Sequence, residues 1–196
     1  MAGDGASLRL FLAVPCPPGL AVKLGQMQTE LAAPTWDLDF AQPEDFHLTL
    51  HFMGPTPARV LGDLKKELGA VCHARRPFDL DCGGLGCFPD EKDPRVLWAG
   101  IRDPAGKLED LFNASLRVLN AYRLFKLRGV LAPHVSLARV RRLSAAWDPA
   151  LLRGLAPQWA SLGRYPVEHL GLFHSRGDAA DGPRYDCLAK LDLGGR

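Results

Sequence analysis

Residues 46–52, FHLTLHF, alternate strictly between apolar and polar side chains. The apolar positions are Phe46, Leu48, Leu50 and Phe52, and the polar positions are His47, Thr49 and His51. A period of two residues is typical of a β-strand with one buried face and one open face. The pattern therefore predicts a strand that presents histidine and threonine on its open face.

A helix over the same residues is the alternative, because it would bring His47 and His51 to positions i and i+4, a spacing that can bind zinc. The usual helical zinc signature has a glutamate directly after the first histidine, where this chain has Leu48. Gly54 and Pro55 also close the segment after a few residues. We therefore favour the strand, in which the two histidines lie about 13 Å apart and cannot share a metal ion.

A second hexad, HVSLAR from His134, repeats the pattern of HLTLHF from His47. In both hexads a histidine is followed by an aliphatic residue, a hydroxyl residue and a leucine, and the sixth residue is a large side chain able to stack. A single His-x-Thr on an open strand face is commonplace. Its recurrence with the same spacing indicates a functional site. The candidate members of that site are His47, Thr49, His134 and Ser136.

The remaining segments divide into helices and strands. Apolar residues at helical spacing predict helices over residues 18–33, 57–73, 104–123 and 148–160. Apolar runs bounded by turn residues predict strands over residues 7–14, 78–88, 95–101, 164–174 and 184–192. Each half of the chain thus combines strands, helices and one hexad. We expect an α+β fold of two pseudo-symmetric lobes, each an antiparallel sheet with flanking helices, with the hexads converging on an active-site cleft between the lobes.

Composition supports one globular unit. The chain has 196 residues, of which 47% are hydrophobic and 23% charged, so it can bury a large core and is not disordered. No Gly-Ser linker separates the halves, and we treat residues 1–196 as a single bilobal domain. The N-terminal stretch contains Asp4 and Arg9, so we expect no secretory signal, no membrane span and a cytoplasmic location. The five cysteines form no Cys-x-x-Cys pair, which favours reduced thiols.

Two histidines beside one substrate atom suit general acid–base catalysis near neutral pH, because one ring can be neutral while the other is protonated. Thr49 and Ser136 can donate hydrogen bonds to anionic oxygens, and Arg139 can supply a cation or a planar surface for a base. These groups fit a phosphodiester substrate. The sequence has no carboxylate cluster, HExxH motif or GxxxxGK[ST] loop, so we expect chemistry without a metal ion or another cofactor.

The chain resembles the two-histidine phosphoesterase superfamily, and within it the bacterial and archaeal RNA 2′,3′-cyclic phosphodiesterases, also called 2′-5′ RNA ligases. The resemblance covers nearly the whole chain. Its carriers are RLFLAV (9–14), FHLTLHFMG (46–54), RVLWAG (95–100), PHVSLAR (133–139) and GLFHSR (171–176), with Tyr185 before the last strand. The chain departs from the family pattern in having His51 where a small or basic residue is usual and Ser136 where threonine is commoner.

The resemblance implies that His47 and His134 act as acid and base, and that Thr49 and Ser136 hold the phosphate. Phe52 and Arg139 correspond to family positions that contact the nucleotide. The implied reaction opens a terminal 2′,3′-cyclic phosphate to a 2′-phosphate, with His134 as base and His47 as acid, and its reverse would form a 2′-5′ linkage. The expected partner is an RNA with a 2′,3′-cyclic phosphate end, such as a tRNA fragment, or a cyclic nucleotide. We expect a monomer that does not bind membranes.

Arg139 lies five residues after His134, so in a regular strand it would face the opposite side of the sheet. The same holds for Phe52 relative to His47. We expect a bulge, a twist or a strand end to redirect both side chains.

Two other interpretations stay open. An RNA-end binding module without turnover would use Arg139, Phe52 and the basic residues that follow the second hexad for stacking and phosphate contact. Alternatively, the two hexad histidines are satisfied polar residues in unrelated strands, which the repetition argues against. His51 has no counterpart in the second hexad, and we expect it to be structural or at the surface.

Overall fold

A computed structural model describes residues 7–32, 36–123, 130–143, 145, 147–177 and 184–194. Residues 1–6 of the N-terminal stretch, and the end of the helix predicted over 18–33, lie outside these ranges. No helix within the described ranges is both long and apolar enough to cross a lipid bilayer.

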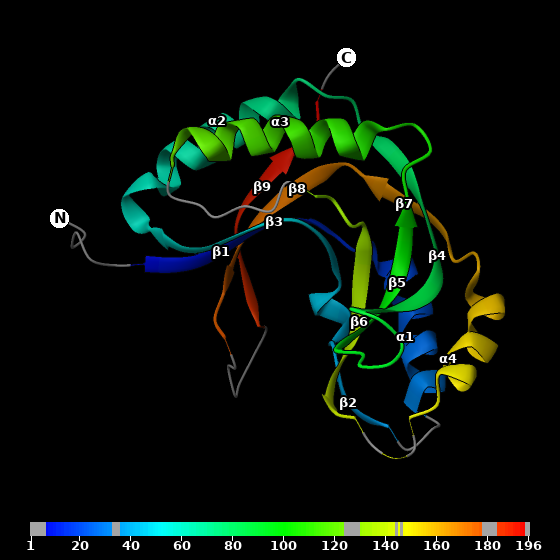
Figure 1. The fold of residues 1–196 in the computed structure, drawn as a ribbon. Helices are drawn as coiled ribbons and strands as arrows, with labels where there is room; N and C mark the ends of the chain where they lie inside the picture. The colour runs from blue at the N-terminus through cyan, green and yellow to red at the C-terminus, as the bar shows by residue number, and fades with distance from the viewer. Residues whose placement is uncertain are drawn as a thin grey trace.

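In the described part of the chain, nine β-strands form one antiparallel sheet that curls around a concave side (Figure 1). The strands are β1 (Ser7–Pro15), β2 (Asp37–Phe40), β3 (His47–Pro57), β4 (Phe78–Phe88), β5 (Val96–Arg102), β6 (His134–Arg142), β7 (Gly163–Val167), β8 (His169–Ser175) and β9 (Tyr185–Asp192). Their order is β7-β4-β5-β6-β3-β1-β8-β9, and β2 pairs with β6.

The two hexad strands, β3 and β6, are neighbours at the centre of this order. They are joined through one register pair, Leu48 with Val135, and further strands follow on either side. The predicted α+β class is confirmed. The sheets that we expected in separate lobes are continuous, because the hexad strands are hydrogen-bonded neighbours rather than opposite walls of a gap.

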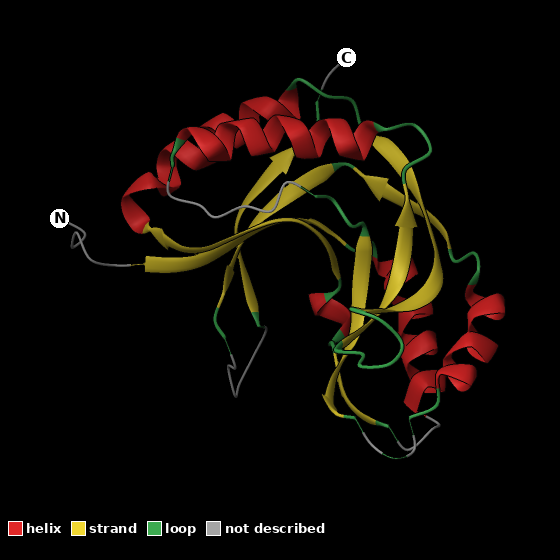
Figure 2. Ribbon diagram, in the orientation of Figure 1, coloured by secondary structure: helices red, strands yellow, loops and turns green. Residues whose placement is uncertain are grey.

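Helices cover the outer side of the sheet in both halves (Figure 2). The α-helices of the described residues are α1 (Pro18–Ala32), α2 (Leu61–His73), α3 (Lys107–Ala121) and α4 (Pro149–Leu155), and three short 3-10 helices span Pro43–Asp45, Ala58–Val60 and Ala156–Trp159. Helices α2 and α3 contact each other and strands β3, β8 and β9, whereas α1 contacts β6 and α4 contacts β4. Helix α1 buries Leu20, Leu24, Met27 and Leu31, whose helical spacing is the pattern that predicts a helix over residues 18–33. None of these four α-helices lies on the concave side, where the described residues include the short 3-10 helix Pro43–Asp45 beside His47.

Three segments differ from the prediction. Strand β3 continues through Gly54 and Pro55. Beyond the hexad no described strand other than β1 pairs with it, and a proline without an N–H is tolerated on such an edge. The single strand predicted over 164–174 is two strands, β7 and β8, which pair with β4 and β1. Strand β2 was not predicted, since it is short and its four residues are exposed or only half-buried.

Candidate active site

The two hexads meet where β3 and β6 join. Because Leu48 pairs with Val135 in antiparallel register, His47 lies across the junction from Ser136. By the same register, Thr49 lies across from His134. Leu48 and Val135 point into the core, so the four polar side chains share the opposite, concave face of the sheet. The structure therefore brings both His-x-hydroxyl pairs together, each histidine beside the hydroxyl of the other hexad.

Each of the two histidines is oriented by the same kind of hydrogen bond, from its ring to a backbone carbonyl. The Nδ1–H of His47 donates to the carbonyl of Asp45 at 2.7 Å, and the Nδ1–H of His134 donates to the carbonyl of Ala132 at 2.6 Å. Each acceptor lies two residues before its histidine. A neutral ring that donates from Nδ1 carries its lone pair on Nε2. Both imidazoles thus keep Nε2 available for a substrate proton.

Burial lowers the pKa of both rings, and in each case the hydrogen bond to a backbone carbonyl partly raises it again. The pKa of His47 is lowered further by the positive charge that His134 carries when protonated. The electrostatic coupling means that protonating one ring disfavours protonating the other. The pair is thereby suited to holding one proton between two sites, as an acid and a base require.

Aromatic side chains surround each imidazole. The ring of His47 lies 4.9 Å from Phe11 on β1 and 5.2 Å from Tyr185 on β9, which meets it edge-on. The ring of His134 lies 4.9 Å from Phe88 and 6.4 Å from Trp98, on strands β4 and β5. These contacts restrict both rings and supply the burial that lowers their pKa.

A β-bulge interrupts each hexad at its fourth residue. Leu50 is skipped in the pairing of β3 with β1, and Leu137 is skipped in the pairing of β6 with β5. An extra residue shifts the alternation of the strand by one, which turns the sixth residue to the face of the first. Phe52 is accordingly 68% exposed, and Arg139 is exposed. The prediction that a bulge redirects these two side chains is confirmed.

The same shift turns His51 to the buried face of the sheet. His51 is 2% exposed, stacks on Phe112, and its Nε2 lies 2.9 Å from Oγ of Ser115 and 3.2 Å from the carbonyl of Phe112. Burial lowers its pKa to about 4. His51 is structural, and the helical zinc alternative is wrong because His47 and His51 lie on opposite faces of a strand. Among the described residues, no three His, Cys, Asp or Glu side chains are grouped to hold a metal ion.

Two hollows share Tyr185 as a lining residue, and one of them is lined by His47. One, of about 100 Å³, is lined by Pro15, Glu44, Asp45, Phe46, His47, Phe173 and Tyr185. The other, of about 290 Å³, is lined by Arg9, Arg139, Gly177, Arg184 and Tyr185. The sequence alone indicated no role for Arg9 or Arg184. A signal for them is their position, one at the start of RLFLAV and the other directly before Tyr185.

The chain is similar to a family of phosphoesterases and to several proteins of one name. Residues 14–98 match the LigT like phosphoesterase family model. The RNA 2′,3′-cyclic phosphodiesterase of Thermus thermophilus is 32% identical over 200 residues, which cover 96% of this chain and 91% of the relative. The protein of that name from Aquifex aeolicus is 31% identical over 160 residues, covering 80% and 82%. A third, from Geobacillus stearothermophilus, is 29% identical, and this chain spans only about half of it, 51%.

Solved structures agree on the fold. The crystal structure of TT0787 from Thermus thermophilus superimposes with a TM-score of 0.78 at 28% identity, covering 96% of this chain and 99% of that one. The structure of E. coli LigT complexed with 3′-AMP gives a TM-score of 0.77 at 23% identity, with the same coverage of both chains. The curled sheet and its helices are therefore shared with these proteins.

Proposed function

This chain belongs to the LigT-like phosphoesterases, and on that basis we propose that it is an RNA 2′,3′-cyclic phosphodiesterase. It opens a terminal 2′,3′-cyclic phosphate to a 2′-phosphate. The observation that carries the proposal is the reciprocal arrangement at the junction of β3 and β6, where each hexad histidine lies across from the hydroxyl of the other hexad. Opening a cyclic phosphate needs such a two-sided site, because one oxygen attacks the phosphorus from one side while another departs on the opposite side.

Hydrolysis requires two proton transfers. Water attacks phosphorus in line with the departing 3′ oxygen, one histidine accepts the proton of the water, and the other donates a proton to the 3′ oxygen. His134 serves as the base, its lowered pKa keeping Nε2 unprotonated. His47 serves as the acid, and the negative charge of a bound phosphate raises the pKa of an adjacent imidazole and so favours its protonated form. With an RNA 5′-hydroxyl in place of water as the attacking group, the same steps form a 2′-5′ linkage and release the 3′-hydroxyl.

The remaining candidate residues bind the substrate. Thr49 and Ser136 donate hydrogen bonds to the non-bridging oxygens of the phosphate without adding a charge. Phe52 offers an exposed aromatic face 5.9 Å from the ring of Phe11, on which a base can stack. Arg139, brought to the same face by the second bulge, supplies a cation and a planar surface. The substrate is an RNA end or a cyclic nucleotide.

The test is turnover of an RNA oligonucleotide that ends in a 2′,3′-cyclic phosphate, in excess EDTA, by the wild type and by His47→Ala and His134→Ala. We expect a 2′-phosphate product, and a rate at least about 100-fold lower in either variant, since an acid or base contributes about 10²- to 10⁴-fold. His73→Ala, which removes an exposed histidine at the end of α2, is the matched control.

Three results would contradict the proposal. Activity within a few-fold of wild type in either hexad variant would remove that histidine from the mechanism. Tight binding of the oligonucleotide without turnover by the wild type would favour a non-catalytic RNA-end binding module. Activity lost to EDTA would require a metal ion in the reaction.

A further inference from the structure

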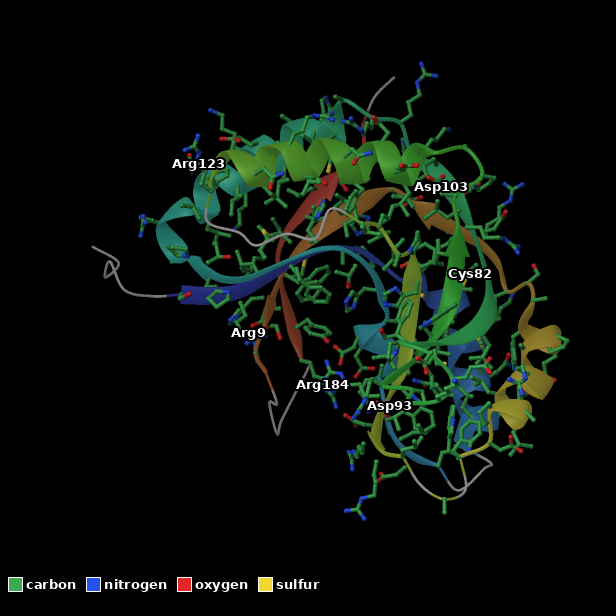
Figure 3. The ribbon with its side chains drawn as sticks, viewed as in Figure 1. Arg9, Cys82, Asp93, Asp103, Arg123 and Arg184 are labelled. Carbon is green, nitrogen blue, oxygen red and sulfur yellow. The ribbon has the colours of Figure 1, made fainter. Side chains whose placement is uncertain are left out.

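Three arginines line one hollow on the concave side of the sheet. Arg9 comes from β1, Arg139 from β6 and Arg184 from the residue before β9, so only the folded chain brings them together. We call the hollow that they line with Gly177 and Tyr185 the arginine pocket. Its volume is about 290 Å³, which is ample for a phosphate group, and none of the described residues that line it is a carboxylate. Figure 3 shows Arg9 and Arg184 on the concave side.

The positive charge of the arginine pocket is only partly neutralised. Among the ion pairs formed by the described residues, none involves Arg9 or Arg139. Arg184 lies 3.6 Å from an oxygen of Asp39, but Arg141 lies 3.2 Å from the same oxygen. One carboxylate is therefore divided between two guanidinium groups. A concave surface with such an excess of arginine attracts an anion.

The arginine pocket adjoins the reaction site. Tyr185, which lines the pocket, also meets the ring of His47 edge-on at 5.2 Å. Arg139 shares the concave face with Ser136 because of the bulge at Leu137. The pocket is therefore separate from the hydroxyls that hold the reacting phosphate, but only one aromatic ring away from a catalytic histidine.

We propose that the arginine pocket binds a second phosphate of the substrate, the one on the 5′ side of the terminal nucleotide. The proposal rests on the function proposed above. A chain that ends in a 2′,3′-cyclic phosphate carries further phosphates only on its 5′ side. The phosphate nearest to an anion site beside the reaction centre is therefore the 5′ phosphate of the terminal nucleotide. Arginine donates two parallel hydrogen bonds to phosphate oxygens, which suits a phosphodiester better than a diffuse charge would. The enzyme thus distinguishes RNA ends from cyclic mononucleotides that have a free 5′-hydroxyl.

The experiment compares two small substrates that differ only in that phosphate: adenosine 2′,3′-cyclic phosphate, and the same compound with a 5′-phosphate. We expect the wild type to show a kcat/KM at least about tenfold higher for the 5′-phosphorylated compound, the effect of one hydrogen-bonded charge pair. In Arg9→Ala and Arg184→Gln the ratio of the two kcat/KM values falls toward one. Arg117→Ala, which removes an exposed arginine from α3, keeps the ratio of the wild type.

Each outcome separates the two proposals. If the wild type turns over neither compound nor an RNA end, the proposed function fails. If it turns over both compounds with equal kcat/KM, or if the ratio persists in Arg9→Ala, the function stands and the second-phosphate site is wrong. If 5′-AMP added separately raises turnover of the unphosphorylated compound as much as the attached phosphate does, the pocket serves a separate nucleotide and the proposal is also wrong. Thermal melting of Arg184→Gln checks that loss of its pair with Asp39 leaves the fold intact.

Discussion

Replacing Phe52 with alanine separates the binding role of its ring from any role in the core. The side chain is 68% exposed, whereas Phe11, 5.9 Å away between ring centres, is 2% exposed. Truncating an exposed strand residue costs about 1 kcal/mol or less in the free energy of unfolding, but truncating a buried phenylalanine costs about 3–5 kcal/mol. We therefore expect Phe52→Ala to unfold within about 1 kcal/mol of wild type, and Phe11→Ala to be far less stable.

The effect of Phe52→Ala on activity should be much larger. Stacking of a base on an aromatic ring contributes about 1–3 kcal/mol, which corresponds to a decrease in kcat/KM of roughly 5- to 150-fold on an RNA end. Phe52→Trp, which keeps an aromatic face, should retain most of the activity. Urea unfolding and initial rates on the same preparations measure both quantities.

The result that would refute this reasoning is a loss of stability in Phe52→Ala comparable with that of Phe11→Ala. It would mean that the ring is buried and that the bulge at Leu50 does not turn it outward. Normal stability with unchanged kcat/KM would instead keep the bulge but remove Phe52 from substrate binding. Leu151→Ala, which shortens another exposed apolar side chain, is the control for nonspecific effects.

Two further predictions concern the histidines. Because the pKa of His47 and that of His134 are both below the ordinary value of 6.5 in the free protein, the acid loses its proton below pH 6.5. The value of kcat/KM should therefore already be in decline at pH 6.5 and should fall further as the pH rises. The corresponding fall in kcat should come at higher pH, since bound phosphate stabilises the protonated ring, and a kcat/KM that is flat to about pH 8 would contradict this. Ser115→Ala should lower the free energy of unfolding by about 1–3 kcal/mol, as its buried Oγ bonds His51 and the carbonyl of Leu111. Ser115→Ala should leave kcat unchanged, because His51 faces away from the site. A large loss of kcat under conditions in which the variant is folded would contradict this and link the buried face of the sheet to catalysis.

The periodic parts of the fold were predictable from the sequence. The apolar stripe of α1 and the alternation at the start of β3 are local patterns, and local patterns determine helices and half-buried strands directly. The repeated hexad singled out His47 and His134 as candidates, and the structure brings the two hexads together. The bulges were inferred only because a functional role was assigned to Phe52 and Arg139 before their position was known.

Other features depend on partners distant in the sequence. Strand β2 forms because β6 offers it an edge, and Asp39 pairs with Arg139 in register although the two residues belong to distant parts of the chain. A proline usually interrupts a strand. Pro55 is tolerated here because it pairs with Arg9 on one side and no described strand pairs with it on the other. The arginine pocket unites three segments that share no motif. No window along the sequence contains this information.

Apart from β2, four described strands lie on each side of the junction of β3 with β6, and this symmetry has a consequence for the roles of the two histidines. A pseudo-twofold axis that passes between Leu48 and Val135 exchanges the two histidines, their carbonyl anchors and their bulged leucines. The two histidines are thus held in almost the same way. The hydrogen bond that orients each ring does not by itself make one histidine the acid and the other the base. Chirality of the ribose and the contrast between Phe52 and Arg139 break that equivalence. Under the proposed function, the orientation of the substrate therefore comes from these nucleotide contacts rather than from the two histidines.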